Sequence, residues 1–272
     1  MQRILGAIFS PKDIRDYRIK KADMAQEFPE EFELELPNVK NQGSVGSCVA
    51  HAIATTIEYH DRDLDPEPKS VGYIYGNRRL TTHLGIGLVT RDALKTTCQY
   101  GDVSFAKFPY NREVPKVIEE VEKVLDDLSE DGELHRFKAY YKLSSVDEVK
   151  TSLMTSGPVI FAMNWYSDMF VNEDGVLKSR SDFDIPYKQG GHCMVIYGWN
   201  KQGWKIRNSW GKSWGVKGNA ILPYDSPIKE LWGVTDDENT LLIKPFTTKI
   251  GRWFAKVFNA ICLFFYKLFY KG

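Results

Sequence analysis

Three stretches of the chain carry residue types that can perform nucleophilic chemistry. The first is a polar, glycine-containing loop, residues 42–47, which leads directly into a stretch of small and apolar residues that begins at Cys48. This order places Cys48 at the start of a predicted helix, where the helix dipole favours the thiolate over the thiol. The side-chain amide of Gln42 could donate a hydrogen bond to the same site. Taken alone, however, a single cysteine is more often a buried and unreactive side chain.

Two downstream stretches change that balance. His192 follows two glycines and opens an apolar run, and Asn208 ends another short run of strand-forming residues. A histidine that is oriented by an asparagine side chain can exchange a proton with a thiolate, as a set of nucleophile, base and orienting group requires. The three stretches together therefore predict that Cys48 is a nucleophile served by His192 and Asn208.

These stretches resemble those of the papain-like cysteine proteases. The most specific part is Asn-Ser-Trp-Gly at 208–211, followed by a second Trp-Gly at 214–215. The resemblance covers residues 37–246 and is weak between the motifs. It implies that Cys48 is the nucleophile, His192 the base, Asn208 the orienting amide and Gln42 the oxyanion-hole amide.

The resemblance also implies an α+β, papain-like fold of two lobes with the active site in the cleft between them. The helical lobe would open with the nucleophile's helix, and the β-rich, barrel-like lobe would carry the histidine and the asparagine. An extended polypeptide substrate would lie in the cleft, and neither a metal nor another cofactor is needed. The residues expected to bind substrate are Gly85, Gly87, Gly190, Gly191 and Trp210. Gly190 and Gly191 would border the pocket for the second residue upstream of the scissile bond, although loop glycines are more often only turns.

The leading prediction is thus a cysteine endopeptidase that works through a Cys48 thioester acyl-enzyme. Two alternatives remain open. One is a catalytically silent papain-like scaffold that is tethered to a membrane or a partner by its C-terminal helix. The other is an enzyme that uses the same acyl-enzyme for peptidyl transfer or deamidation.

The sequence departs from the family pattern at several positions. Val45 stands where many secreted members have a cysteine, so that disulfide is absent, which fits a reducing, intracellular location. Val49 and His51 replace aromatic residues, and the His51 ring is expected to point along its helix rather than across a cleft. Only 36 residues precede Pro37, fewer than in the inhibitory propeptides of secreted relatives. We expect control by expression, location or a partner, or else a short arm packed on the enzyme.

The positions of apolar residues predict the elements that must place these groups. Helices are expected over 48–60, 91–100, 115–128 and 145–155, the last beginning with a capping box at Ser145. Short strands are expected at 158–164, 193–197, 204–207 and 220–223. The predicted organisation is an N-terminal arm (1–36), a helical lobe (37–156), a β-rich lobe (157–246) and a basic amphipathic C-terminal helix (247–272).

Composition limits the classes of function. The chain has 272 residues, 43% of them hydrophobic and 26% charged, which is typical of a globular protein. It carries 36 basic and 36 acidic residues, and this balance argues against a general nucleic-acid binder. Its four cysteines are too few and too scattered for a disulfide scaffold or a zinc site.

The charge is divided unevenly along the chain. From Asn239 onward there are six basic residues and no acidic one, which leaves 30 basic against 36 acidic residues before it. On a helix, the basic residues of 247–272 fall on one side and the aromatic and aliphatic residues fill the rest. The apolar stretch between Lys256 and Lys267 is shorter than the roughly 20 residues that span a bilayer. The pattern favours a location at a membrane surface, with docking on a partner protein or a tilted span as alternatives.

Deletion of residues 247–272 is expected to abolish co-sedimentation with anionic liposomes while peptide cleavage is retained, because the basic and aromatic residues of that stretch supply the membrane affinity. Co-sedimentation that is unchanged by the deletion would rule out the anchor.

Overall fold

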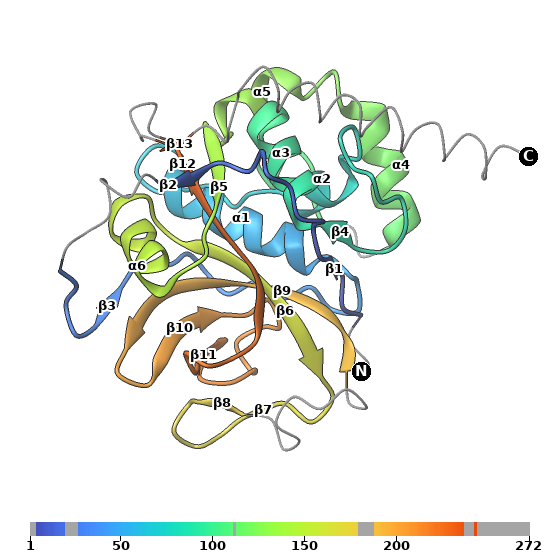
Figure 1. The fold of residues 1–272 in the computed structure, drawn as a ribbon. Coiled ribbons are helices and arrows are strands. Elements are labelled where there is room, and N and C mark those ends of the chain that lie inside the picture. The colour runs from blue at the N-terminus through green and yellow to red at the C-terminus, as the bar shows by residue number, and fades with distance from the viewer. Residues whose placement is uncertain (1–3, 20–26, 111–112, 179–187, 237–241, 244–272) are drawn as a thin grey trace, which may run out of the picture.

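Two lobes, one of helices and one built on an antiparallel sheet, meet along helix α1 (Cys48–Asp61), as Figure 1 shows. The computed structural model describes residues 4–19, 27–110, 113–178, 188–236 and 242–243. The fold predicted from the resemblance, α+β with two papain-like lobes, is confirmed in the described residues. The predicted C-terminal helix, 247–272, lies outside them.

The helical lobe is built around α1, which is almost wholly buried. Every residue from Cys48 to Glu58 is buried, because small and apolar side chains occupy most of its faces. The other helices are α2 (Val71–Gly76), α3 (Thr90–Tyr100), α4 (Val114–Val124), α5 (Ser129–Leu134) and α6 (Val146–Thr155). The last of these begins at the predicted cap, where Ser145 Oγ accepts from the Glu148 N–H at 3.2 Å.

The second lobe is built on one sheet of the described residues, in the order β11-β10-β9-β6-β12-β5, with β3 also paired to β9. Its strands are β3 (Phe32–Glu33), β5 (Ala139–Lys142), β6 (Val159–Tyr166), β9 (Lys188–Asn200), β10 (Gly203–Arg207), β11 (Asn219–Leu222) and β12 (Ile228–Thr235). Smaller pairs are formed by β1 (Ala7–Ile8) with β4 (Leu88–Val89), β2 (Arg18–Ile19) with β13 (Leu242–Ile243), and β7 (Phe170–Val171) with β8 (Leu177–Lys178).

The four predicted helices and four predicted strands are all present, and the differences have identifiable causes. Helix α2 was not predicted because its sequence, VGYIYG, has two glycines and no helical period. Strand β12 was missed because Lys229 and Glu230 interrupt its apolar pattern, and β5 was missed because it has only four residues, AYYK. Both strands join the sheet, and β5 lies within 37–156, so the sheet of the β-rich lobe also takes a strand from the range predicted as the helical lobe. The domain boundaries near residues 36, 156 and 246 stay predictions.

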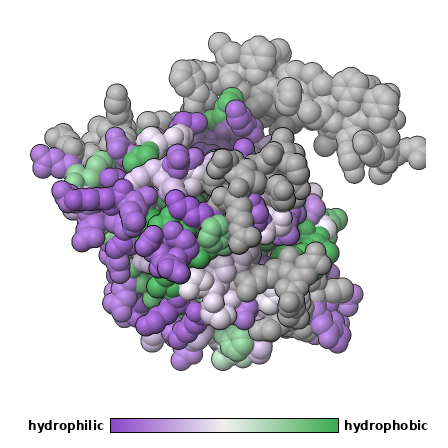
Figure 2. Space-filling view, turned by 90° about the horizontal axis from the view of Figure 1, so that it is seen from below, coloured by the Kyte–Doolittle hydropathy of each residue, from purple (hydrophilic) through white to green (hydrophobic). Residues whose placement is uncertain are grey.

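The outer surface of the described residues is mostly hydrophilic on the face in Figure 2, with apolar side chains gathered in small patches between charged ones. Within the described ranges, no helix combines the length and the apolar character that crossing a bilayer requires.

Candidate active site

Cys48 is the first residue of α1 and is completely buried. Burial raises the pKa of its thiol, and backbone hydrogen bonds from Cys193 and Gly6 lower that pKa by less. The contact with the backbone of Cys193 brings the thiol next to the residue that follows His192. The contact with Gly6 shows that the N-terminal arm lies directly over the same sulfur.

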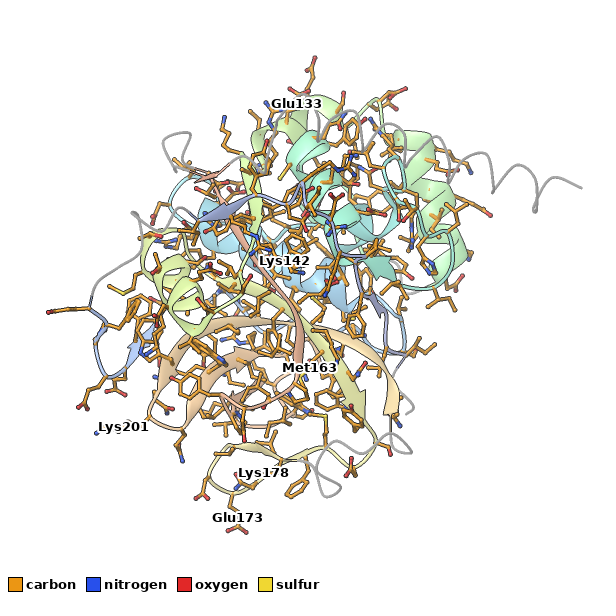
Figure 3. The ribbon with its side chains drawn as sticks, viewed as in Figure 1. Glu133, Lys142, Met163, Glu173, Lys178 and Lys201 are labelled. Atoms are coloured by element: carbon orange, nitrogen blue, oxygen red, sulfur yellow. The ribbon has the colours of Figure 1, made fainter. Side chains whose placement is uncertain are left out.

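His192 and Asn208 are joined by a hydrogen bond from His192 Nε2 to Asn208 Oδ1 of 2.9 Å. His192 lies within β9, and Asn208 follows the end of β10, so the pairing of these two strands places them together. The Ser209 backbone N–H donates to the same Asn208 oxygen at 2.7 Å, which fixes the orientation of the amide. Met163 on β6, labelled in Figure 3, pairs in register with His192 from the other side of β9.

Aromatic rings exclude water from this hydrogen bond. Trp210 stacks on the His192 ring with centroids 4.6 Å apart, and Trp165 contacts it edge-on at 5.4 Å. The histidine is not exposed at all, and Asn208 is 2% exposed. In such surroundings a hydrogen bond is stronger than in water.

Gln42 has its side chain held in one orientation. Its Oε1 accepts from Ser209 Oγ at 2.7 Å and from Trp210 Nε1 at 3.1 Å. Its Nε2 donates to the carbonyl oxygen of Val45 at 2.8 Å and to that of Ile4 at 3.2 Å. One amide N–H is therefore directed toward the N-terminal arm at Ile4, and the other is used within the loop at Val45.

Three of the four glycines expected to bind substrate, Gly87, Gly190 and Gly191, lie next to residues 5–7 of the N-terminal arm. A Cβ on Gly191 would meet the Ala7 carbonyl oxygen at 2.0 Å, and one on Gly190 would meet the Leu5 side chain at 3.2 Å. A Cβ on Gly87 would meet the Gly6 carbonyl oxygen at 2.4 Å. These glycines keep room for an apposed backbone.

The fourth glycine, Gly85, lies elsewhere, because it is exposed and the nearest atoms to its Cβ position belong to His83, at 3.0 Å. The backbone amide that pairs with the arm on this side is that of Leu88, which donates to the Gly6 carbonyl at 2.8 Å. The roles of Gly85, Gly87, Gly190, Gly191 and Trp210 in substrate binding all stay predictions.

The backbone N–H and carbonyl of Gly87 hydrogen-bond the side chains of Tyr75 and Arg78, which the sequence analysis did not identify. Its N–H donates to Tyr75 Oη at 3.1 Å, and its carbonyl accepts from Arg78 Nη1 at 2.9 Å. The same Nη1 donates to the His83 carbonyl at 3.1 Å, and the guanidinium lies 4.8 Å from the centre of the Tyr75 ring. Arg78 is only 8% exposed, and burial lowers its pKa. A sequence pattern could not have indicated this, because nothing local requires a cation there.

His51 and the cysteines other than Cys48 have structural surroundings that account for them without a catalytic role. His51 Nδ1 is 2.9 Å from the Ser47 carbonyl, one turn back along α1, and its ring meets Tyr110 edge-on. The described cysteines, Cys48, Cys98 and Cys193, are free thiols. Burial raises the pKa of Cys98 to about 12 and that of Cys193 as well, which keeps both unreactive.

Comparison with known proteins agrees with this geometry. Residues 87–226 match the family model described as papain family cysteine protease. A peptidase C1-like protein of Acanthamoeba polyphaga mimivirus is 25% identical over 68% of this chain and 63% of its own length. A cysteine protease of the mite Blomia tropicalis is 27% identical over 73% of this chain and 61% of its own length. The chain thus spans about three fifths of the length of these curated relatives.

Solved structures show the same fold. Xylellain, a cysteine protease from Xylella fastidiosa, superposes with a TM-score of 0.73 at 23% identity, covering 86% of this chain and 96% of that one. ProCathepsin B S9 from Trypanosoma congolense gives a TM-score of 0.64 at 18% identity, with 85% of each chain covered.

Ser209→Ala removes one of the two donors that hold Gln42 Oε1, and we expect kcat/KM for peptide cleavage to fall about fivefold, the value of one neutral hydrogen bond. Steady-state cleavage of a fluorogenic peptide measures it. In a Gln42→Ala background the same substitution should have almost no effect, since its partner is gone. Equal losses in both backgrounds would contradict a role through Gln42.

Arg78→Met removes the charged donor to two loop carbonyls, and we expect amide hydrogen exchange over residues 83–88 to accelerate by about tenfold or more. Exchange followed by mass spectrometry measures it. Arg62→Met is the matched control, because Arg62 also covers a tyrosine ring, at 4.2 Å from Tyr59, but is exposed. Unchanged exchange in Arg78→Met would show that the loop does not depend on this side chain.

Proposed function

Because the chain belongs to the papain family of cysteine proteases, we propose that it is an endopeptidase whose nucleophile is Cys48. The observation that carries the proposal is the buried hydrogen bond between His192 and Asn208, at 2.9 Å, beside the backbone of Cys193, which hydrogen-bonds Cys48 at the N-terminus of α1. A hydrogen-bonded His–Asn pair beside a cysteine at a helix start is the set of groups that thiol acyl transfer needs.

The first step transfers the Cys48 proton to His192. Since Nε2 of His192 is bound to Asn208, Nδ1 is the nitrogen that takes this proton. The imidazolium that forms lowers the free energy of the adjacent thiolate, and so does the positive end of α1. Asn208 holds the ring in the tautomer and orientation that the transfer requires.

In the second step the Cys48 sulfur attacks the carbonyl carbon of a peptide bond, and the carbonyl oxygen becomes an oxyanion. The Gln42 Nε2–H and the Cys48 backbone N–H donate to it. His192 then gives its proton to the leaving amine as the carbon–nitrogen bond breaks, which leaves a thioester on Cys48. Water, deprotonated by His192, hydrolyses the thioester and restores the thiol.

An epoxide inhibitor that alkylates thiol proteases is the direct test. We expect covalent labelling of the wild-type site, located by mass spectrometry at Cys48, and none in Cys48→Ala. His192→Ala should lower the labelling rate by about 10²-fold or more, because the proton acceptor is lost. Labelling is measured on the full chain and on Gly6→Leu, since Gly6 covers the sulfur. Absence of Cys48-dependent labelling in both forms would refute the proposal.

A further inference from the structure

The side-chain amide of Asn208 has two ends, and the hydrogen bonds described so far use only one of them. Its Oδ1 accepts from His192 Nε2 at 2.9 Å and from the Ser209 N–H at 2.7 Å. Because both donors meet the oxygen, the nitrogen Nδ2 is turned to the opposite side. Nδ2 is buried, and it has no hydrogen-bond partner among the described residues.

A buried amide N–H without an acceptor is destabilising, and buried polar groups are therefore almost always paired with a protein atom or with a held water. The Asn208 amide also orients the proposed base. If Nδ2 were left loose, the whole side chain could turn and carry Oδ1 away from the His192 ring. The partner of Nδ2 therefore matters for the geometry of proton transfer as well as for stability.

A small cavity lies between Asn208 and helix α1, which packs against β9 (Figure 1), and we call it the rear cavity. Its volume is about 10 Å³, which is room for one water molecule. Residues 193–195 of β9 and residues 207–209 line it from the sheet. The other lining residues are His51, Ala52 and Thr55 of α1, and Lys40.

The Thr55 hydroxyl borders the rear cavity and can accept a further hydrogen bond. It donates its proton to the His51 carbonyl, one turn back along α1, at 2.9 Å. A hydroxyl oxygen has one proton and two lone pairs, so Thr55 Oγ1 can still accept from a water. Since Thr55 is only 5% exposed, a held water rather than bulk solvent fills that role.

A held water needs two to four polar partners, and the rear cavity supplies three. Asn208 Nδ2 would donate to the water, and the water would donate to Thr55 Oγ1. Lys40 borders the same cavity, and its ammonium, which is paired with Glu58, carries three donors. One water can therefore satisfy the buried Nδ2 and connect it to α1.

A single held water agrees with the dry surroundings of the hydrogen bond between His192 and Asn208. Trp210 and Trp165 cover the imidazole ring, whereas the rear cavity lies on the Nδ2 side of the amide. The cavity is too small for a second water that could reach Oδ1. Lys40 and His51 also line a pocket of about 580 Å³, so a water can enter the rear cavity between them.

We propose that the rear cavity holds one water that links Asn208 Nδ2 to Thr55 Oγ1, and that Thr55 is thereby a positioning residue for the base. The inference rests on the proposed function of Cys48, His192 and Asn208. Thr55 touches neither the substrate nor the reacting atoms. It keeps the Asn208 amide, and through it the His192 ring, in the orientation that proton transfer needs.

The kinetic test compares three variants in steady-state cleavage of a fluorogenic peptide. Thr55→Val removes the hydroxyl at nearly constant volume, and kcat should fall about fivefold with KM unchanged, because one neutral hydrogen bond is lost. Thr55→Ser keeps the hydroxyl and should return kcat to within about twofold of wild type.

Thr56→Val is the matched control. Thr56 is buried and makes the same hydrogen bond one turn back along α1, to the Ala52 carbonyl at 2.9 Å, but it does not line the rear cavity. Its kcat should equal that of wild type. Equal losses of kcat in Thr55→Val and Thr56→Val, or no recovery in Thr55→Ser, would overturn the positioning role.

A crystal structure of the full chain supplies a measurement that does not depend on activity. We expect one water within about 3.2 Å of both Asn208 Nδ2 and Thr55 Oγ1, and its loss in Thr55→Val. A wild-type crystal structure in which Nδ2 donates to a protein carbonyl, or in which no water lies in the rear cavity, would overturn the proposal. The wild-type structure decides this point even where Thr55→Val fails to fold.

The two proposals fail differently. Cys48-dependent cleavage that is the same in wild type, Thr55→Val and Thr56→Val would overturn the positioning role and leave the peptidase intact. Absence of Cys48-dependent cleavage in both wild type and Gly6→Leu, with the water present in the crystal structure, would refute the peptidase and leave the water site in place.

Discussion

The exclusion of water from the hydrogen bond between His192 and Asn208 is the constraint on which the rest of the site depends. Trp210 covers the histidine ring and, through its indole N–H, also fixes the Gln42 amide. Ser209 does the same for Asn208 and Gln42 with its backbone and side chain. The three consecutive residues Asn208, Ser209 and Trp210 thus share the task of orienting the His192 ring and the Gln42 amide.

Near the site, the backbone carbonyl groups of His83 and Gly87 are partly or fully buried, and a buried carbonyl without a hydrogen-bond donor is destabilising. A side-chain donor satisfies them here. Arg78 binds the carbonyls of His83 and Gly87 and lies over the Tyr75 ring, and no carboxylate is among its contacts in the described residues. A buried cation that satisfies these carbonyls holds the loop without a covalent link.

The parts of the fold that could be predicted from the sequence are those determined by residues close together along the chain. The helix at Cys48, the capped helix at Ser145 and the strands carrying His192 and Asn208 follow from small-residue runs, caps and β-branched stretches. The sequence did not predict α2 or β12, whose stability comes from packing between distant segments rather than from their own pattern. The motif residues could be placed in one site because they carry a family pattern, and the structure brings them together.

The side chains that support the site could not be predicted from the sequence either, because they act through contacts between segments that no local pattern connects. Nothing near Arg78 indicates that its partners are carbonyls nine residues or fewer downstream, and nothing near Gly6 indicates that it crosses Cys48, 42 positions away. The length of the N-terminal stretch predicted an arm, but not where on the enzyme the arm packs. Its position depends on pairing with β4 and on the ion pair of Asp16 with Arg91, both of which are long-range contacts.

The pairing of β3 with β9 has a consequence for how strongly the arm must bind. Because β3 adds the same N-terminal region to the edge of the sheet, the arm is tethered close to the cleft whether or not its tip is seated. A tethered peptide meets its site at an effective concentration in the millimolar range, independent of how much protein is present. The contacts of residues 4–8 with Gln42 and Leu88 are therefore intramolecular, and their formation does not depend on protein concentration.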